Sequence, residues 1–229
     1  MSQNQSMTLE QALSADLSIS DHTGLKDSEI DDSNSTSTIT SDPIIHWINS
    51  RRSIGNLTIP APTDEQVIKA IECAVTAPDH KKLRPWRFIV VKGNARHELG
   101  RAFLAAAEAQ ATQKGEVLDD KARQKAYNMP LRAPMIVTVV TQIKPHDKVP
   151  AFEQLLSTGA AVQNLILALK AQGFSSVWRT GPLCNEPAVK AYFEVDEADY
   201  VAAFVYTGSS HCEMPSRGEI EIEDVLSFK

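Results

Sequence analysis

Apolar residues recur along the chain from Pro43 onward, in runs that alternate between helical and extended spacing. The first run, IIHWIN at 44–49, has the spacing of a short helix. The next run begins at Thr63 and Gln66, which have the spacing of a capping box, and Pro78 is expected to stop this second helix. The apolar stripe of the second helix comprises Val67, Ile68, Ile71, Ala74 and Val75.

Four further segments have the composition of β-strands. We expect strands at 86–92, 134–142 and 200–208, and a short one that leads into Trp178. The run from 134 is apolar and β-branched, which is typical of a strand buried on both faces of a sheet.

Helical patterns separate these strands. Asn94 is expected to cap a long alanine-rich helix, and a more polar helix follows and ends near Asn128. Residues 152–172 have the pattern of a long buried helix, with Gly173 as its C-terminal glycine, and 186–193 form a small helix. Helices and strands therefore share one core in residues 43–229.

Charge is distributed unevenly along the 229 residues, whose net charge is −6. Residues 1–42 carry one lysine and eight acidic residues, whereas the rest has 22 basic and 21 acidic residues. The acidic segment lacks aromatic residues, and we expect it to be a disordered tail. Neither a basic nucleic-acid footprint nor a targeting signal is evident, and no apolar stretch approaches the roughly 20 residues of a membrane span. We therefore expect a cytoplasmic protein that binds neither nucleic acid nor membrane.

Several kinds of chemistry lack their motifs. The chain contains no G-x-G-x-x-G, no G-x-x-x-x-G-K-[ST] and no G-x-S-x-G, which argues against a Rossmann dehydrogenase, a P-loop enzyme and a serine hydrolase. The six histidines are scattered without ligand spacing, so no metal is expected. The three cysteines Cys73, Cys184 and Cys212 have unrelated spacings and are expected to be buried or inert.

Three basic, polar clusters remain, each at the end of an apolar element: RRS at 51–53, APDHKKLRPW at 77–86 and WRT at 178–180. Each has a purely structural alternative. The two arginines could compensate a helix dipole, His80 could cap a turn, and Trp178 could be an edge core residue covered by the stem of Arg179. Because the clusters carry planar and phosphate-complementary donors, we expect them to line one shared cleft.

The segment from Ile44 to about Gly208 resembles the nitroreductase family of flavin mononucleotide (FMN) proteins, and in particular its small, minimal NAD(P)H nitroreductase members. Four motifs in the family's order carry the resemblance: RRSIG, APDHKKLRPWRFIVV, RAPMIVTVV and GAAVQNLILALKAQGFSSVWRTG. The resemblance implies an α+β nitroreductase-like fold, in which helices flank a central mixed β-sheet. It also implies a homodimer with flavin between the subunits.

The resemblance also assigns a site. A guanidinium and a hydroxyl suit the FMN phosphate, and a second arginine near the pyrimidine edge of the ring stabilises negative charge on reduction. Many relatives have an N-x-Q-P-W pattern where this chain has His80 and Arg84 before Pro85 and Trp86. The residues expected to bind FMN are Arg51, Arg52, Ser53, Thr76, His80, Trp178, Arg179, Thr180 and, near the C-terminus, Arg217. The segment that matches a nicotinamide-binding region is Ala168, Leu169, Lys170, Ala171, Gln172 and Gly173.

By the same resemblance, NAD(P)H delivers a hydride to flavin N5 and leaves, and an electron-poor acceptor such as a nitro-compound or quinone then takes the electrons. This ping-pong scheme needs no catalytic nucleophile from the protein. Small residues in the helix 152–172 suit close packing against a second subunit, although the same helix could be core within one subunit. A second class of function stays open, a flavin-binding sensor or partner-binding module without turnover.

Overall fold

The computed structural model describes residues 43–229, so the acidic segment 1–42 and its expected disorder lie outside the described residues. The first half of the described chain contains α2 (Pro43–Asn49), α3 (Asp64–Ala74), η1 (His80–Lys82), β1 (Trp86–Lys92), α4 (Ala95–Gln113), α5 (Asp120–Tyr127) and η2 (Met129–Arg132). The second half contains β2 (Met135–Thr141), α6 (Ala151–Ala171), β3 (Ser175–Arg179), η3 (Pro182–Asn185), α7 (Pro187–Tyr192), β4 (Tyr200–Gly208) and η4 (Ile222–Asp224). Every helix and strand expected from the sequence is present.

The four strands form one sheet in the order β1-β2-β4-β3. Lys92 at the end of β1 pairs with Met135 at the start of β2, so the helical connection returns the chain to the same end of the sheet. The β2–β4 and β3–β4 pairs are also antiparallel, with a register shift between Val139 and Val140 of β2. The expectation of a mixed sheet is therefore wrong for the described residues, where the α+β sheet is antiparallel throughout.

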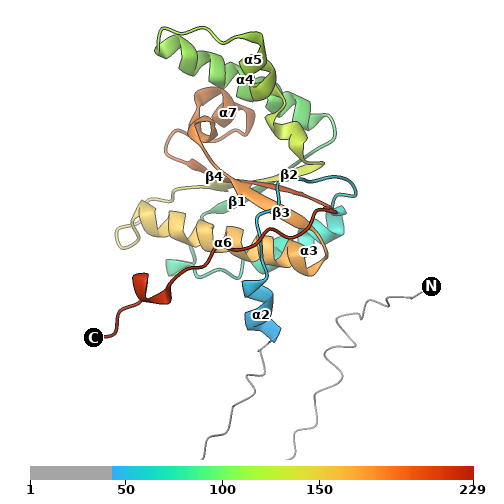
Figure 1. Ribbon diagram of the computed structural model, residues 1–229. Helices are drawn as coiled ribbons and strands as arrows, with labels where there is room; N and C mark the ends of the chain where they lie inside the picture. The colour runs from blue at the N-terminus through green and yellow to red at the C-terminus, as the bar shows by residue number, and fades with distance from the viewer. Residues whose placement is uncertain (1–42) are drawn as a thin grey trace, which may run out of the picture. The chain divides into compact units, whose positions relative to one another are not determined.

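Helices cover both faces of this sheet (Figure 1). α3 and α6 pack on one face, and α4, α5 and α7 lie on the other side. β2 is buried at all seven positions, because it is central in the sheet and has a helical layer on each side. Its continuous apolar sequence thus reflects burial on both faces, and it does not indicate parallel pairing.

Of the two expected N-terminal helix caps, one is formed and the other is not. At α3 the capping box is formed, since Gln66 N donates to Thr63 Oγ1 (3.3 Å) and Thr63 N donates to Gln66 Oε1 (2.9 Å). Asn94 precedes α4 but makes no capping bond, which corrects the expectation. Its backbone is already helical (φ −67°, ψ −27°), and its side chain donates instead to Glu98 Oε1 (3.3 Å). Gly173 ends α6 as expected, with φ +86°.

Several apolar side chains are left on the surface of the described chain. α2 has no buried residue, and the α3 stripe is only partly inside, because Ile68 and Val75 are 56% and 44% exposed. On α6, Phe152 is 60% and Leu156 66% exposed. No helix within residues 43–229 is both long enough and apolar enough to cross a bilayer.

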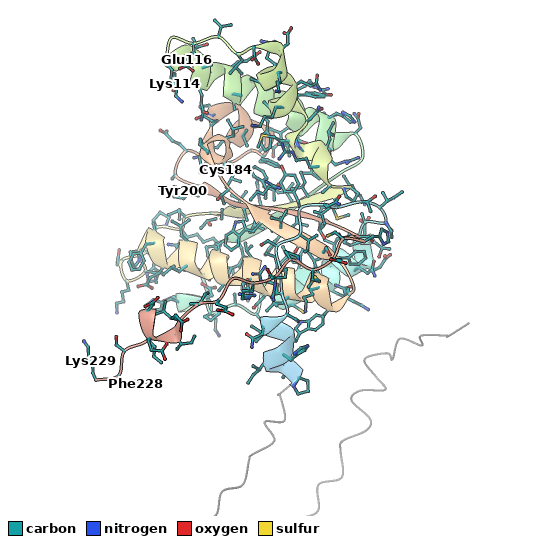
Figure 2. The ribbon with its side chains drawn as sticks, viewed as in Figure 1. Lys114, Glu116, Cys184, Tyr200, Phe228 and Lys229 are labelled. Carbon is teal, nitrogen blue, oxygen red and sulfur yellow. The ribbon has the colours of Figure 1, made fainter. Side chains whose placement is uncertain are left out.

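The three cysteines do not share one environment. Cys184 is buried on the α7 side of the sheet (Figure 2), and burial raises the pKa of its thiol. Cys73 and Cys212 are exposed, so of the three only Cys184 is buried, and the expectation that the two exposed thiols are inert stays a prediction.

Candidate functional site

The segment that follows α2 lies against the edge strand β3. Ile54 N donates to the main-chain oxygen of Ser176 (3.0 Å), which anchors the segment to the strand. At Gly55 a Cβ atom would lie 3.2 Å from Arg179 Nη2, so the absent side chain leaves room for this guanidinium. The fold therefore brings the first and third basic clusters together.

Four cationic side chains gather beside this contact. Arg217 comes from the C-terminal segment, and its Nη2 donates to the main-chain oxygens of Arg51 (2.8 Å) and Asn49 (3.4 Å). Arg51, Arg52 and Lys170 line a cavity of about 220 Å³ at the same place. We call Arg51, Arg52, Lys170 and Arg217 the cationic cluster.

Lys170 enters the cationic cluster from the C-terminal end of α6. Its Nζ donates to Ser50 Oγ (2.5 Å) and to the main-chain oxygen of Trp47 (3.2 Å), and it lies 3.4 Å from the centroid of the Trp47 ring. Burial lowers the pKa of Lys170, and repulsion from Arg51 and Arg52 lowers it further. The positive charges of the two arginines thus act electrostatically on the Lys170 ammonium group.

No carboxylate neutralises the cationic cluster within residues 43–229. The ion pairs of this part of the chain join Lys92 to Asp64 and Arg123 to Glu108, and the Glu153 carboxylate contacts His80. The Arg51 side chain has a single weak acceptor, Ser53 Oγ at 3.4 Å. An anion is therefore the ligand that complements this site.

The Arg52 side chain donates its hydrogen bonds to main-chain oxygens of the protein. Its Nη1 donates to the main-chain oxygen of Asn49 (2.8 Å), the last residue of α2, and its Nε donates to that of Pro215 (3.0 Å). Arg52 thus lies at the C-terminal end of α2 and donates to its last main-chain oxygen, as the structural alternative of a helix-end cation expected. Arg52 also ties the C-terminal segment to the cluster.

The WRT cluster lies at the end of a strand. Trp178 and Arg179 belong to β3, and only Thr180 lies beyond it. Trp178 is 38% exposed and faces α6, since a Cβ at Gly159 would lie 3.9 Å from the indole, whose Nε1 donates to Ala202 O (3.2 Å). Pairing of β3 with β4 thus holds the large aromatic partly open to solvent.

Arg179 has an unsatisfied buried nitrogen. Its Nε is buried without a hydrogen-bond partner, and its Cζ lies 5.6 Å from the centroid of the Tyr206 ring. Arg179 lines a cavity of about 380 Å³ together with apolar side chains such as Phe103 and Met129. Burial raises the pKa of Tyr206 to about 12, so its phenol stays neutral beside the guanidinium.

Thr76 and His80 occupy a different part of the surface. Thr76 Oγ1 donates to Cys73 O (2.7 Å) and accepts from Asn164 Nδ2 (3.4 Å). His80 Nδ1 lies 2.8 Å from Glu153 Oε2 at the beginning of α6. Neither makes a contact with the cationic cluster or Arg179, so one chain does not bring all three basic clusters together.

Of the segment 168–173, only Lys170 and Gly173 line the cavity of the cationic cluster. Leu169 is fully buried, and Gln172 Nε2 donates to the main-chain oxygen of Gln66 on α3 (3.0 Å). The position of Lys170 beside Arg51 was missed by sequence reasoning, because no local pattern connects the end of α6 with α2. A nicotinamide site in this segment stays a prediction.

Sequence comparisons place the chain among known relatives. The model of the nitroreductase family matches residues 48–209. Putative NAD(P)H nitroreductase YdjA of Escherichia coli (strain K12) is 39% identical over 179 residues, 78% of this chain and 93% of the relative. The putative NAD(P)H nitroreductase of Haemophilus influenzae is 40% identical over 184 residues, 79% of this chain and 96% of the relative.

Solved structures share the fold. The nitroreductase-like family protein from Bacillus cereus superposes with a TM-score of 0.69 at 22% identity, over 83% of this chain and 97% of that one. A nitroreductase with bound FMN from Bacteroides fragilis gives a TM-score of 0.63 at 20% identity, over 82% and 100% of the two chains. Because the family model spans most of the chain and two relatives match it at 39% and 40% identity, this protein belongs to the nitroreductase family.

Proposed function

We propose that this protein is an FMN-dependent NAD(P)H oxidoreductase that reduces nitro-compounds, quinones or a similar electron-poor acceptor. The observation that carries the proposal is the cationic cluster, which has no carboxylate partner in residues 43–229 and lies beside Arg179 at the end of β3. A dianionic phosphate attached to a planar ring matches such a site. The assignment of residues 43–229 as the FMN-binding domain belongs to the same proposal.

The cationic cluster would hold the FMN phosphate. Arg51 has an almost unused guanidinium and Ser53 a hydroxyl next to it, so both are free to donate to phosphate oxygens. Arg217 adds positive charge from the C-terminal segment, and Lys170 adds it from α6. Arg52 mainly holds the loop in place through main-chain oxygens.

The end of β3 would hold the ring. Trp178 and Thr180 are exposed beside Arg179, which suits contact with a flat ligand. Arg179 carries a fixed positive charge and a buried, unpaired Nε, and this cation would favour the electron-rich, reduced form of a ring placed next to it. When bound, FMN supplies the chemistry by accepting a hydride from NAD(P)H and passing electrons to the acceptor.

A homodimer would complete the site. Thr76 and His80 lie apart from the cationic cluster within one chain, and α6 presents exposed Phe152 and Leu156. Burial of these apolar side chains against a second copy would remove them from water. It would also allow Thr76 and His80 of one subunit to reach flavin held by the other.

The test is an absorbance spectrum of the purified protein, followed anaerobically after addition of NADPH or NADH. The proposal expects a yellow protein that bleaches rapidly and regains its colour with a nitroaromatic or quinone. A yellow protein that neither nicotinamide bleaches would instead indicate a flavin-binding sensor. A colourless protein that cannot be reconstituted with FMN would refute the cofactor assignment.

A further inference from the structure

A second cavity lies between the end of α3 and the beginning of β1. It has a volume of about 490 Å³ and shares no lining residue with the cavity of the cationic cluster. Its lining combines apolar side chains with charged side chains from the loop around His80: Val75, Ala77, Asp79, Lys82, Arg84 and Trp86.

The loop that supplies these charges has a backbone that side-chain-bearing residues rarely adopt. Lys81, Lys82 and Arg84 have φ values of 63°, 55° and 48°, in the left-handed region that glycine and asparagine occupy more readily. Two contacts hold this shape: Arg84 N donates to Asp79 Oδ2 (2.7 Å), and Lys144 Nζ donates to Leu83 O (2.6 Å). The loop thus holds long cationic side chains in a fixed position, although its left-handed backbone is strained. Backbone strain of this kind is typical of functional sites.

The two cations of this cavity have no ion-pair partner among the described residues. Lys82 and Arg84 are exposed and form no salt bridge in residues 43–229. Asp79 is the one carboxylate of the lining, and the Arg84 N–H already occupies one of its oxygens. The cavity therefore has an excess of positive charge, which favours a phosphate group.

The apolar part suits the rest of a nucleotide. Val75 is 44% exposed and the indole of Trp86 is half-buried, so both offer apolar surface to a flat base. A cationic pair next to an aromatic side chain has the chemistry that recognises a phosphorylated nucleoside.

The position of Lys82 close to His80 in the sequence indicates which nucleotide would bind in this cavity. Lys82 is two residues from His80, which the proposed function places at the flavin, so a nicotinamide nucleotide reacting there could extend its adenosine end across this loop. NADPH differs from NADH only by the 2′-phosphate on that adenosine. We infer that Lys82 and Arg84 bind the 2′-phosphate of NADPH in this cavity and thereby select NADPH over NADH. This inference rests on the proposed function.

The first experiment measures binding without turnover. Adenosine 2′,5′-bisphosphate and 5′-AMP are titrated into the full chain by calorimetry. We expect the bisphosphate to bind at least tenfold more tightly than 5′-AMP, and Lys82→Gln and Arg84→Gln each to remove most of that difference. Lys121→Gln, a change of an exposed lysine on α5, is the matched control and should leave both affinities as they are.

The second experiment compares the two cofactors in anaerobic flavin reduction. The ratio of kcat/KM for NADPH to that for NADH is expected to fall at least tenfold in Lys82→Gln and in Arg84→Gln, with flavin content and Tm unchanged. If kcat/KM fell equally for NADPH and NADH, the two cations would contact the pyrophosphate that both cofactors share, and the inference would be overturned. It would also be overturned if the wild-type protein bound adenosine 2′,5′-bisphosphate and 5′-AMP with equal affinity. Failure of the proposed function appears separately, as absence of flavin or of reduction by either cofactor.

Discussion

Arg217 Nη2 donates a hydrogen bond to the main-chain oxygen of Arg51 (2.8 Å), although 166 positions separate the two residues. This contact ties the C-terminal segment to the loop after α2 and places a third guanidinium beside Arg51 and Arg52. It makes the C-terminal segment part of the candidate site.

Removal of this guanidinium should weaken FMN binding. We expect Arg217→Ala to raise the dissociation constant of FMN about tenfold or more, because a hydrogen bond to a charged group contributes about 1.5–3 kcal/mol. Titration of the apoprotein by quenching of flavin fluorescence measures this. Arg217→Lys, which keeps the charge, should lose less, and an unchanged affinity in Arg217→Ala would remove Arg217 from the phosphate site.

Lys170 should give FMN binding a distinctive pH dependence. Because burial and then the charges of Arg51 and Arg52 hold its pKa below the usual 10.5, Lys170 loses its proton at a lower pH than an ordinary lysine. A phosphate ligand needs the protonated form, so FMN affinity should fall as the pH rises above neutral, and the fall should begin at a lower pH than the usual lysine pKa of 10.5 would give. In Lys170→Gln the affinity should be weaker at neutral pH and should fall less steeply. Parallel curves for the two proteins would show that Lys170 does not contact the phosphate.

The exposed apolar face of α6 should control the oligomeric state. Leu156 is 66% exposed, and a charge placed there would be buried in the proposed dimer at a large cost in desolvation. We expect Leu156→Glu to be monomeric in size-exclusion chromatography with light scattering and to retain less FMN. Val117→Glu, at a 93% exposed position between α4 and α5, should match the wild type. A monomeric wild type, or a dimeric Leu156→Glu, would contradict the proposed interface.

Gly100 should be indispensable for the packing of α4 against α5. Alanine is the better helix former by about 1 kcal/mol, but its Cβ at this position would lie 2.5 Å from the main-chain oxygen of Tyr127. Overpacking of this kind costs about 1–3 kcal/mol, and a backbone oxygen cannot move aside as a side chain can. Urea denaturation of Gly100→Ala should therefore show a lower free energy of unfolding. At Gly218 a Cβ meets nothing within 4 Å, so Gly218→Ala should unfold like the wild type.

The local features of the fold were predictable from the sequence. The capping box at Thr63 and the terminal glycine of α6 at Gly173 each depend on a few neighbouring residues, and both are present. Asn94 shows the limit of such signals, because a residue type that can cap a helix does so only where its backbone is extended, and here it is helical. Strand direction was not predictable either, since the apolar run of β2 reports burial and not the direction of its neighbours.

The sequence by itself determined the elements, their order and the family, because periodicity, caps and motifs are properties of nearby residues. Only the tertiary structure decided which distant side chains share a site. It brought Lys170 and Arg217 to Arg51, placed Arg179 against Gly55, and left His80 paired with Glu153 at the other end of α6. These residues become neighbours because the strands pair and the helices pack on the sheet. Contacts between residues far apart in the sequence produce no periodic pattern in it, so they could not be predicted from it.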